Sequence, residues 1–323
     1  EAEVRRKIVE SGDVDVMISI RSNFFYTRSV PCELWFFDRD KPEPLKDKVL
    51  MLDARNVFTK VTRKIYDFSP EQLQNLTAVI WLYRGQADRY LALLESYLQA
   101  VIDEARETAE PVAGFIEALD DLLDRLPDVD AETKELSGLF KKDEQAFQAA
   151  VAKAEKDWGK AARDNAGLKN AAEGFSPLAE SSRDLIKQID QLYKFAEKLA
   201  KESGARGLNK LVKELDECRK EAVEQLKQVR YFHKQAHWLQ ERFPEAELCD
   251  VEGLVKLVDR EEIKTNDWSL TPGRYVGVAP EVEDEDFDFE ETLRDIHIEL
   301  QGLNEEATVL AAQIQKNFEE LGV

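Results

Sequence analysis

The sequence predicts a mostly α-helical protein with a small α/β portion near its N-terminus. Three short runs rich in β-branched and aromatic residues fall between Val14 and Arg55, which is typical of strands. From about residue 87 to residue 243, apolar positions recur at spacings of three and four, which is typical of helices. Of the 323 residues, 43% are hydrophobic, enough to bury a core, and 34% are charged, a composition that favours long helices.

The N-terminal elements follow from these patterns. Residues 2–11 are expected to form a short helix, which Gly12 ends as glycine commonly does. Strands are expected near 14–20, 32–37 and 49–53, because each run is short and β-rich. These elements predict the beginning of a small sheet.

A helix start is recognisable in the sequence Ser69-Pro70-Glu71-Gln72. Serine suits the N-cap, proline the first helical position, and a glutamine three residues after the cap can complete a capping box. The apolar pattern continues to Gly85. We therefore expect a helix that begins after Ser69.

The region 87–243 is expected to contain five helices. Antiparallel neighbours are expected because the connections are short. The predicted breaks are residues 110–111, 127–130, 174–177 and 204–207.

The C-terminal part is expected to hold a mixed connector, 243–263, then a loop or short extended segment, 268–278, and a last helix of about 288–321. The last helix carries a heptad seam, and such a seam needs a partner helix. Its seam residues include Leu293, Ile296, Leu300, Leu303, Leu310 and Ile314.

Three segments carry a resemblance to a known family. The first is Arg21-Ser-Asn-Phe-Phe-Tyr-Thr-Arg-Ser-Val-Pro31, which lies between the first two predicted strands. The others are Val-Leu-Met-Leu-Asp-Ala-Arg at 49–55 and Trp-Ser-Leu-Thr-Pro-Gly-Arg-Tyr-Val at 268–276. Together they resemble the C-terminal half of the modification subunit of type I DNA restriction–modification systems, an N6-adenine DNA methyltransferase. The resemblance covers about residues 1–85 and 248–323.

The resemblance implies a domain organisation. Residues 1–68 would be the C-terminal edge of a Rossmann-like methyltransferase sheet, 69–247 a helical domain with a large insertion, and 248–323 a tail motif followed by the heptad helix. The family's usual insertion between Gly85 and Leu248 is much shorter than the one here, near residues 86–247, and extended coupling to partner subunits is one interpretation of the additional residues. The heptad helix would dock on the specificity subunit.

The resemblance also implies a function. The parent enzyme would transfer a methyl group from S-adenosylmethionine to adenine N6 in a specific DNA sequence. Its partners would be the specificity and restriction subunits, its location the cytoplasm, and it would contact DNA only as part of the complex. The alternative is a non-enzymatic helical coiled-coil scaffold, in which residues 87–243 are the functional unit.

The aromatic loop holds the candidate site residues. An adenine that is methylated must leave the duplex, and the extruded base needs an aromatic or apolar face for stacking. Phe25 is the first candidate for this ring, Tyr26 the second, and Phe24 the third. The alternative is that all three rings pack under the hairpin. For Asp53 and Arg55, a strand-terminal turn with a local salt bridge is an interpretation that requires no chemistry.

Motifs for cofactor binding and catalysis do not occur in the sequence. It contains no Asn-Pro-Pro-aromatic tetrapeptide and no glycine-rich phosphate loop, so the chain by itself is expected to be inert, with no catalytic residue and no cofactor. His233 and His237 are four residues apart, but a third metal ligand is missing, and a partly buried polar seam explains them without a metal. A net charge of −21 should repel DNA, although a basic patch can lie locally in an acidic chain.

Compartment and membrane contact can also be judged from the sequence. Cys32, Cys218 and Cys249 are far apart and odd in number, as expected of reduced thiols in a cytosolic protein. No apolar run is long enough to span a bilayer, so no membrane span is expected. The charged first residues are not a signal peptide.

Overall fold

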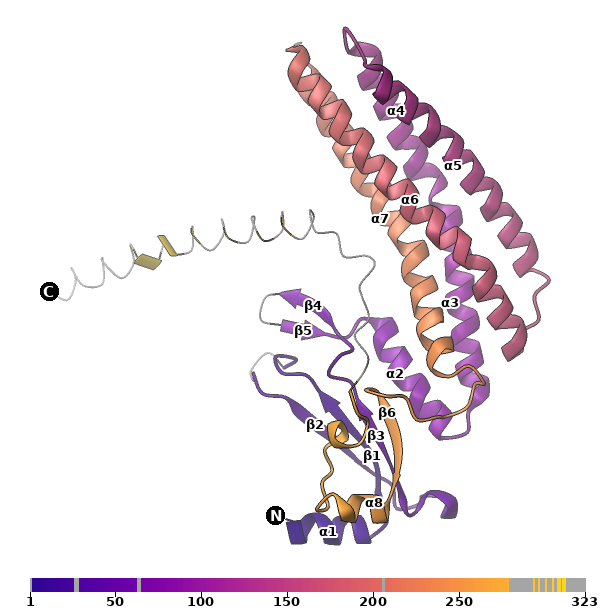
Figure 1. The fold of residues 1–323 in the computed structure, drawn as a ribbon, viewed down its shortest axis with the longest axis vertical. Helices are drawn as coiled ribbons and strands as arrows, with labels where there is room; N and C mark the ends of the chain where they lie inside the picture. Colours follow the sequence, from indigo (N-terminus) through magenta and orange to yellow (C-terminus); the bar gives the residue numbers. More distant parts are fainter. Residues whose placement is uncertain are drawn as a thin grey trace, which may run out of the picture. The chain divides into compact units, whose positions relative to one another are not determined.

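The computed structural model describes residues 2–25, 29–62, 65–204 and 207–278, together with single helical positions between 293 and 311. The chain divides into two units, residues 1–278 and 279–323 (Figure 1). The described residues are mostly helical and include a small mixed sheet. This confirms the predicted fold class at that level. No helix among the described ranges is long and apolar enough to cross a membrane.

The main sheet of the first unit has four strands in the order β2-β1-β3-β6. Strand β1 is parallel to β3, whereas β2 is antiparallel to β1 and β6 is antiparallel to β3. The three strands expected from the sequence are confirmed. Strand β6 was not predicted, because it follows all the long helices and lies in the segment interpreted as a mixed connector. The strands are β1 (Val14–Ile20), β2 (Cys32–Phe37), β3 (Lys48–Asp53) and β6 (Val255–Asp259).

Strands β1 and β3 are buried on both faces of the sheet. Alternate side chains of a strand point in opposite directions, so each strand contributes to two separate layers. Val16 and Leu50 pack with helix α2 (Pro70–Tyr83) and the other long helices. Met17 and Met51 pack on the opposite face with the short elements that complete this layer. These elements are α1 (Ala2–Glu10), α8 (Arg260–Thr265) and the 3-10 turn η2 (Pro272–Arg274); a second such turn, η1 (Glu43–Leu45), precedes β3.

Helix α2 begins as its sequence predicts. The Ser69 hydroxyl accepts a hydrogen bond from the Gln72 backbone N–H at 3.2 Å, and the Gln72 side chain accepts one from the Ser69 backbone N–H at 2.9 Å. The helix ends before Gly85, whose φ of +69° is readily adopted only by glycine. The capping box is therefore confirmed in full.

A two-stranded hairpin, β4 (Thr59–Thr62) and β5 (Ile65–Asp67), precedes α2. It was not predicted from the sequence. The segment Thr-Lys-Val-Thr-Arg-Lys-Ile-Tyr-Asp is short and polar, and it lacks the Asn-Gly or Asp-Gly turn that would have indicated a hairpin.

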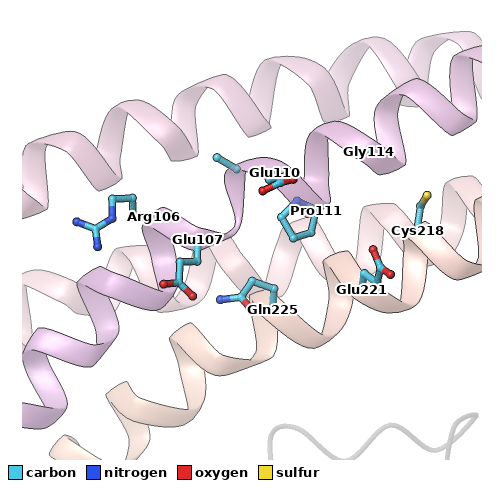
Figure 2. Close-up of a pocket in the computed structure, with 9 residues that line it drawn as sticks. Arg106, Glu107, Glu110, Pro111, Gly114, Cys218, Glu221 and Gln225 are labelled. Atoms are coloured by element: carbon cyan, nitrogen blue, oxygen red, sulfur yellow. The ribbon is translucent and has the colours of Figure 1, made fainter.

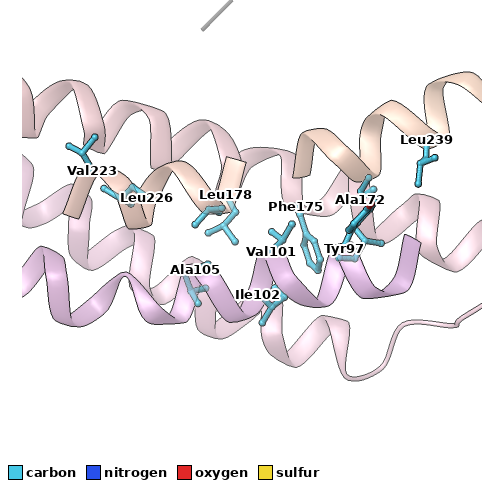
Figure 3. Packing of buried hydrophobic residues seen from close by; sticks show 14 of the residues in the cluster. Tyr97, Val101, Ile102, Ala105, Ala172, Phe175, Leu178, Val223, Leu226 and Leu239 are labelled. Atoms are coloured by element: carbon cyan, nitrogen blue, oxygen red, sulfur yellow. The ribbon is translucent and has the colours of Figure 1, made fainter. Parts of the chain in front are cut away.

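The region 87–243 contains five helices, as predicted. Tyr97, Val101 and Leu226 are among the side chains that fill the space between them, and Figure 3 shows this packing. One continuous apolar cluster extends from this bundle to the Val16 face of the sheet. The helices are α3 (Ala87–Glu107), α4 (Ala109–Arg125), α5 (Ala131–Trp158), α6 (Asn165–Ser203) and α7 (Leu208–Arg242).

Helices α3 and α4 are not the antiparallel neighbours that the short connection predicts. Only Thr108 separates them, and its backbone is right-handed helical, with φ −67° and ψ −21°. A single residue in that conformation cannot reverse the chain, so α4 continues in the direction of α3 (Figure 1). Helix α7 packs along both.

The expected break at 174–177 is also wrong, because α6 runs through Pro177. A proline inside a helix removes one N–H donor and crowds the preceding turn. Here burial of the neighbouring Phe175 and Leu178 compensates. The true break lies at residues 159–164, where Asp164 caps α6 by accepting a hydrogen bond from the Gly167 N–H at 2.8 Å.

Candidate functional site

Two of the segments that carry the resemblance meet at the end of β3. The Arg55 Nε donates to Asp53 Oδ1 at 2.8 Å and to Oδ2 at 3.1 Å. Asp53 is buried, whereas the Arg55 side chain is half exposed. The hydrogen bond to Asp53 raises the pKa of Arg55. The Asp-Ala-Arg sequence therefore forms the strand-terminal turn with a local salt bridge that was considered from the sequence.

The segment 268–276 packs against this turn. A Cβ at Gly273 would lie 2.4 Å from Arg55 Nη2 and 3.2 Å from Asp53 Oδ2, so a larger residue there would require the Arg55 guanidinium to shift. The Tyr275 hydroxyl donates to the Ser269 carbonyl at 2.6 Å, and burial raises the pKa of Tyr275 to about 12. Residues from the beginning and the end of the first unit are therefore in direct contact.

The aromatic loop starts where β1 ends. Phe24 packs against Phe68, with ring centroids 4.5 Å apart. Phe25 is 44% exposed, and Tyr26 lies outside the described residues. The packing interpretation therefore applies to Phe24, whereas the base-stacking role of Phe25 stays a prediction.

Arg21 links this loop to the β4–β5 hairpin. Its guanidinium carbon lies 4.1 Å from the Phe58 ring centroid and 4.3 Å from the Tyr66 ring centroid. The Tyr66 backbone N–H donates to the Asn23 carbonyl at 3.1 Å. The Nε of Arg21 is buried and makes no hydrogen bond. This residue was not predicted as part of the site, although its place at the carboxyl end of β1 was a usable signal.

A buried charge cluster connects β1 to the end of α2. Asp15 is 1% exposed; it accepts a hydrogen bond from the Tyr83 hydroxyl at 2.8 Å and pairs with Arg84. The Lys41 Nζ lies 3.9 Å from the same carboxylate and donates to the backbone carbonyls of Val14 and Lys48. Burial lowers the pKa of Lys41 and raises the pKa of Tyr83. This cluster, which was not predicted, ties the sheet to the helical region.

A cavity of about 580 Å³ lies between the α3–α4 junction and α7 (Figure 2). Three glutamates and one arginine among its lining residues make it a poor site for a phosphate-bearing ligand. Burial raises the pKa of the Cys218 thiol, which therefore stays protonated and is a weak nucleophile. The lining residues are Arg106, Glu107, Ala109, Glu110, Pro111, Gly114, Cys218, Glu221 and Gln225.

The two neighbouring histidines point to different surroundings. The Nε2 of His233 lies 3.1 Å from the Ala172 carbonyl and 3.3 Å from the Ser176 hydroxyl, and burial lowers its pKa. The His237 side chain is exposed. Within the described ranges, no group of three His, Cys, Asp or Glu side chains could hold a metal ion. The polar-seam interpretation fits His233.

Of the six positions of the predicted docking seam, two fall outside the described residues. Leu303 and Ile314 belong to the residues that are not described. The other four positions are helical, and their side chains are exposed: Leu293, Ile296, Leu300 and Leu310.

Ligands of open α/β sheets bind at the carboxyl ends of strands, so the ends of β1 and β3 are where S-adenosylmethionine would be expected. A ribose hydroxyl needs a free carboxylate, but Asp53 is buried and already bound by Arg55. Gly273 closes the space beside it. These residues do not fit the cofactor.

The N-terminal part of the chain is similar to known proteins. Residues 1–104 match the family model described as N-6 DNA Methylase. The chain is 27% identical over 88 residues to the type I restriction enzyme MjaIX methylase subunit of Methanocaldococcus jannaschii. This aligned segment covers 27% of this chain and 16% of that protein. It is 41% identical over 76 residues to the HindI methylase subunit of Haemophilus influenzae, which covers 24% of this chain and 17% of that protein.

The matched segments thus span about a sixth of the length of these relatives. The family match ends inside α3. It therefore includes the aromatic loop, the hairpin, α2 and three strands of the main sheet, but not β6. Residues 1–104 of the chain are therefore similar to the N-6 DNA methylase family, in agreement with the resemblance to type I modification subunits.

Proposed function

We propose that the chain is part of a type I, S-adenosylmethionine-dependent DNA adenine-N6 methylase subunit. Residues 1–68 act as the C-terminal edge of its Rossmann-like catalytic sheet and supply the base-stacking loop. Residues 69–247 form a helical platform, and 248–323 carry the tail segment and a helix that docks on the specificity subunit. The restriction subunit joins when DNA is cleaved. The family match of residues 1–104 supports this proposal.

The observation that carries the proposal is the exposed edge strand β2. Within the described residues, its one strand neighbour is β1. Leu34 and Phe36 project from one face, Trp35 and Phe37 from the other, and all four are 37% to 53% exposed. Strand β1 beside it is buried on both faces. A long apolar edge of this kind is a template for pairing with another strand.

The occupant we propose for this edge is a strand from the remainder of the methylase catalytic domain. The matched segments cover only 16% and 17% of the two relatives, so most of a methylase subunit lies outside them. A further strand would satisfy the free backbone groups of β2, and layers on the two faces would cover Trp35 and Phe36. The cofactor site would then lie on that remainder, since the carboxyl end of β3 does not fit it.

The loop after β1 is suited to hold an extruded adenine. It leaves the carboxyl end of β1 next to the carboxyl end of the parallel strand β3, where open α/β sheets bind ligands. Phe24 anchors the loop on Phe68, while the neighbouring Phe25 offers an exposed ring. We assign Phe25 the base-stacking role and Tyr26 the second place.

The test uses the chain assembled with the remainder of the methylase subunit and its specificity subunit. Trp35→Lys with Phe37→Lys should prevent assembly, because charges cannot enter a buried sheet. Phe25→Ala should leave assembly intact and slow methylation. Base–aromatic stacking is worth ~1–3 kcal/mol, so a loss of roughly ten- to a hundredfold is expected.

The Phe25→Ala defect should shrink on DNA whose target adenine is mispaired, because that base is easier to extrude. The matched control is Phe24→Ala, which removes the packing on Phe68 and should lower stability as well as activity. Equal losses on paired and mispaired DNA would assign Phe25 to packing and refute its stacking role.

The second candidate is the non-enzymatic helical scaffold. It is favoured by the size of the helical region, in which five helices share one apolar cluster with a sheet face. Normal assembly of the Trp35→Lys, Phe37→Lys chain with the other subunits would favour this candidate, because a scaffold has no use for the β2 edge.

A further inference from the structure

Two segments of this acidic chain have a reversed local charge. The chain carries a net charge of −21, but residues 16–32 and 54–66 contain no aspartate or glutamate. Their charged residues are all basic: Arg21, Arg28, Arg55, Lys60, Arg63 and Lys64. The sequence allows a local basic patch in an acidic chain, and these two segments are where such a patch would lie.

The described residues of the two segments lie together in the fold, although residues 33–53 separate the segments in sequence. The Tyr66 N–H donates to the Asn23 carbonyl at 3.1 Å, which joins β5 to the aromatic loop. The Arg21 guanidinium lies against the rings of Phe58 and Tyr66, at 4.1 Å and 4.3 Å. The hairpin is therefore held next to the loop that carries Phe25.

The hairpin presents an open surface. All four residues of β4 are exposed. An isolated two-stranded hairpin is marginally stable in water, so its attachment to Arg21 and Asn23 matters for its position. Asp67 lies opposite Thr59 at the base of the hairpin and accepts a hydrogen bond from the Phe68 N–H at 2.8 Å.

The basic side chains differ in how they are neutralised. Arg55 is paired with Asp53, which leaves little of its charge for a partner. No ion pair engages Arg21 or the exposed Lys60 among the residues that the structure describes. The two aromatic rings hold the Arg21 guanidinium in place while its Nε makes no hydrogen bond. An arginine fixed by aromatic stacking is pre-organised to bind phosphate.

We propose that the β4–β5 hairpin and Arg21 form a DNA-backbone contact beside the base-stacking loop. This inference rests on the proposed function. It adds that the hairpin holds the DNA strand from which the adenine is extruded. Phosphate contacts fix the register of DNA on a protein, and exposed aromatic rings next to cations are typical of sites that bind unstacked bases. Lys60 supplies one contact and Arg21 another. Phe25 lies on the loop that the hairpin packs against.

DNA explains this surface better than an acidic protein does. An acidic protein would contact the charges, whereas the exposed Phe25 ring on the adjoining loop also offers a face on which a base can stack. The net charge of −21 opposes DNA at long range, so binding by the chain alone should be weak and local.

The test measures DNA binding by the full chain with fluorescence anisotropy. The probe is a labelled duplex with one mispaired adenine, titrated at low ionic strength and again at rising salt. Lys60→Glu should weaken binding about fivefold and reduce the slope of log affinity against log salt by about one. The matched control is Lys169→Glu on α6, an exposed lysine away from the hairpin, which makes the same change in net charge.

The salt slope separates the possible outcomes. Equal effects of Lys60→Glu and Lys169→Glu, or no binding by the wild-type chain at the lowest salt, would overturn the proposal. Arg21→Gln should also reduce the slope, and circular dichroism would show whether that chain remains folded. Displacement of the duplex by polyglutamate as readily as by unlabelled DNA would mean a general polyanion surface and would refute the assignment to DNA.

Phe25→Ala separates this inference from the proposed function. It should lower affinity for the mispaired probe without changing the salt slope, because stacking involves no phosphate. If Phe25→Ala behaves in this way and Lys60→Glu has no effect, the hairpin proposal fails while the base-stacking loop stands.

Discussion

Replacing Asp15 by asparagine should destabilise the first unit by about 3 kcal/mol. Asparagine keeps the shape of the side chain and can still accept the Tyr83 hydrogen bond, but it removes the negative charge. Lys41 would then be a buried ammonium without its nearest carboxylate, since its Nζ now lies 3.9 Å from Asp15. At an effective dielectric constant of about 20, a pair at that distance gains about 4 kcal/mol.

This figure is the Coulomb attraction alone and does not include the free energy needed to remove the lysine ammonium from water. Breaking a buried pair by removing one partner typically costs about 3–5 kcal/mol. Arg84, whose side chain is 30% exposed, can turn toward solvent and so adds little. A loss of about 3 kcal/mol is a large fraction of the ~5–15 kcal/mol by which a folded domain is normally stable.

The assay is urea unfolding followed by circular dichroism, with Asp120→Asn as the matched control. Asp120 pairs with Lys141 at 2.7 Å, closer than Asp15 to Lys41, but both side chains are more than a third exposed. An exposed pair contributes less than about 1 kcal/mol. If Asp15→Asn shifts the urea midpoint no more than Asp120→Asn does, burial is not what makes the Asp15 cluster important, and the reasoning is wrong.

Two further predictions concern pH and partner docking. Burial raises the pKa of Tyr275 from 10.0 to about 12, so between these pH values the folded chain keeps a proton that the unfolded chain loses, and the stability of the fold should decrease. Tyr275→Phe should make this decrease shallower. The same variant should cost about 1 kcal/mol of stability, because it removes the hydrogen bond to the Ser269 carbonyl. Urea midpoints measured across this pH range check the change, and an unaltered slope would contradict it. Deleting residues 288–323 should abolish co-purification with the specificity subunit and leave the circular dichroism of the rest unchanged; loss of the folded signal would assign that helix to the internal core.

The local elements of this protein could be predicted because their signals lie close together in the sequence. The Ser69 capping box joins Ser69 to Gln72 within one helical turn, and the strand β1 and the five long helices follow from residue periodicity. The aromatic loop was likewise visible as three adjacent rings between two strands. The sequence alone could not tell that Phe24 packs on Phe68 while Phe25 is exposed, because that depends on where α2 begins relative to the loop.

The features that join distant parts of the chain were decided by the tertiary structure. Strand β6 pairs with β3 although all the long helices lie between them in sequence, and the Asp53–Arg55 pair lies directly against Gly273. The hairpin beside Arg21 and the Asp15 cluster depend in the same way on contacts that no local pattern encodes. Helix α6 continues through Pro177 because burial of its neighbours outweighs the local cost of proline. The sequence by itself therefore determined the first three strands, most of the helical segments and the family they resemble. Packing decided which side chains meet, since that energy arises only when remote segments are brought together.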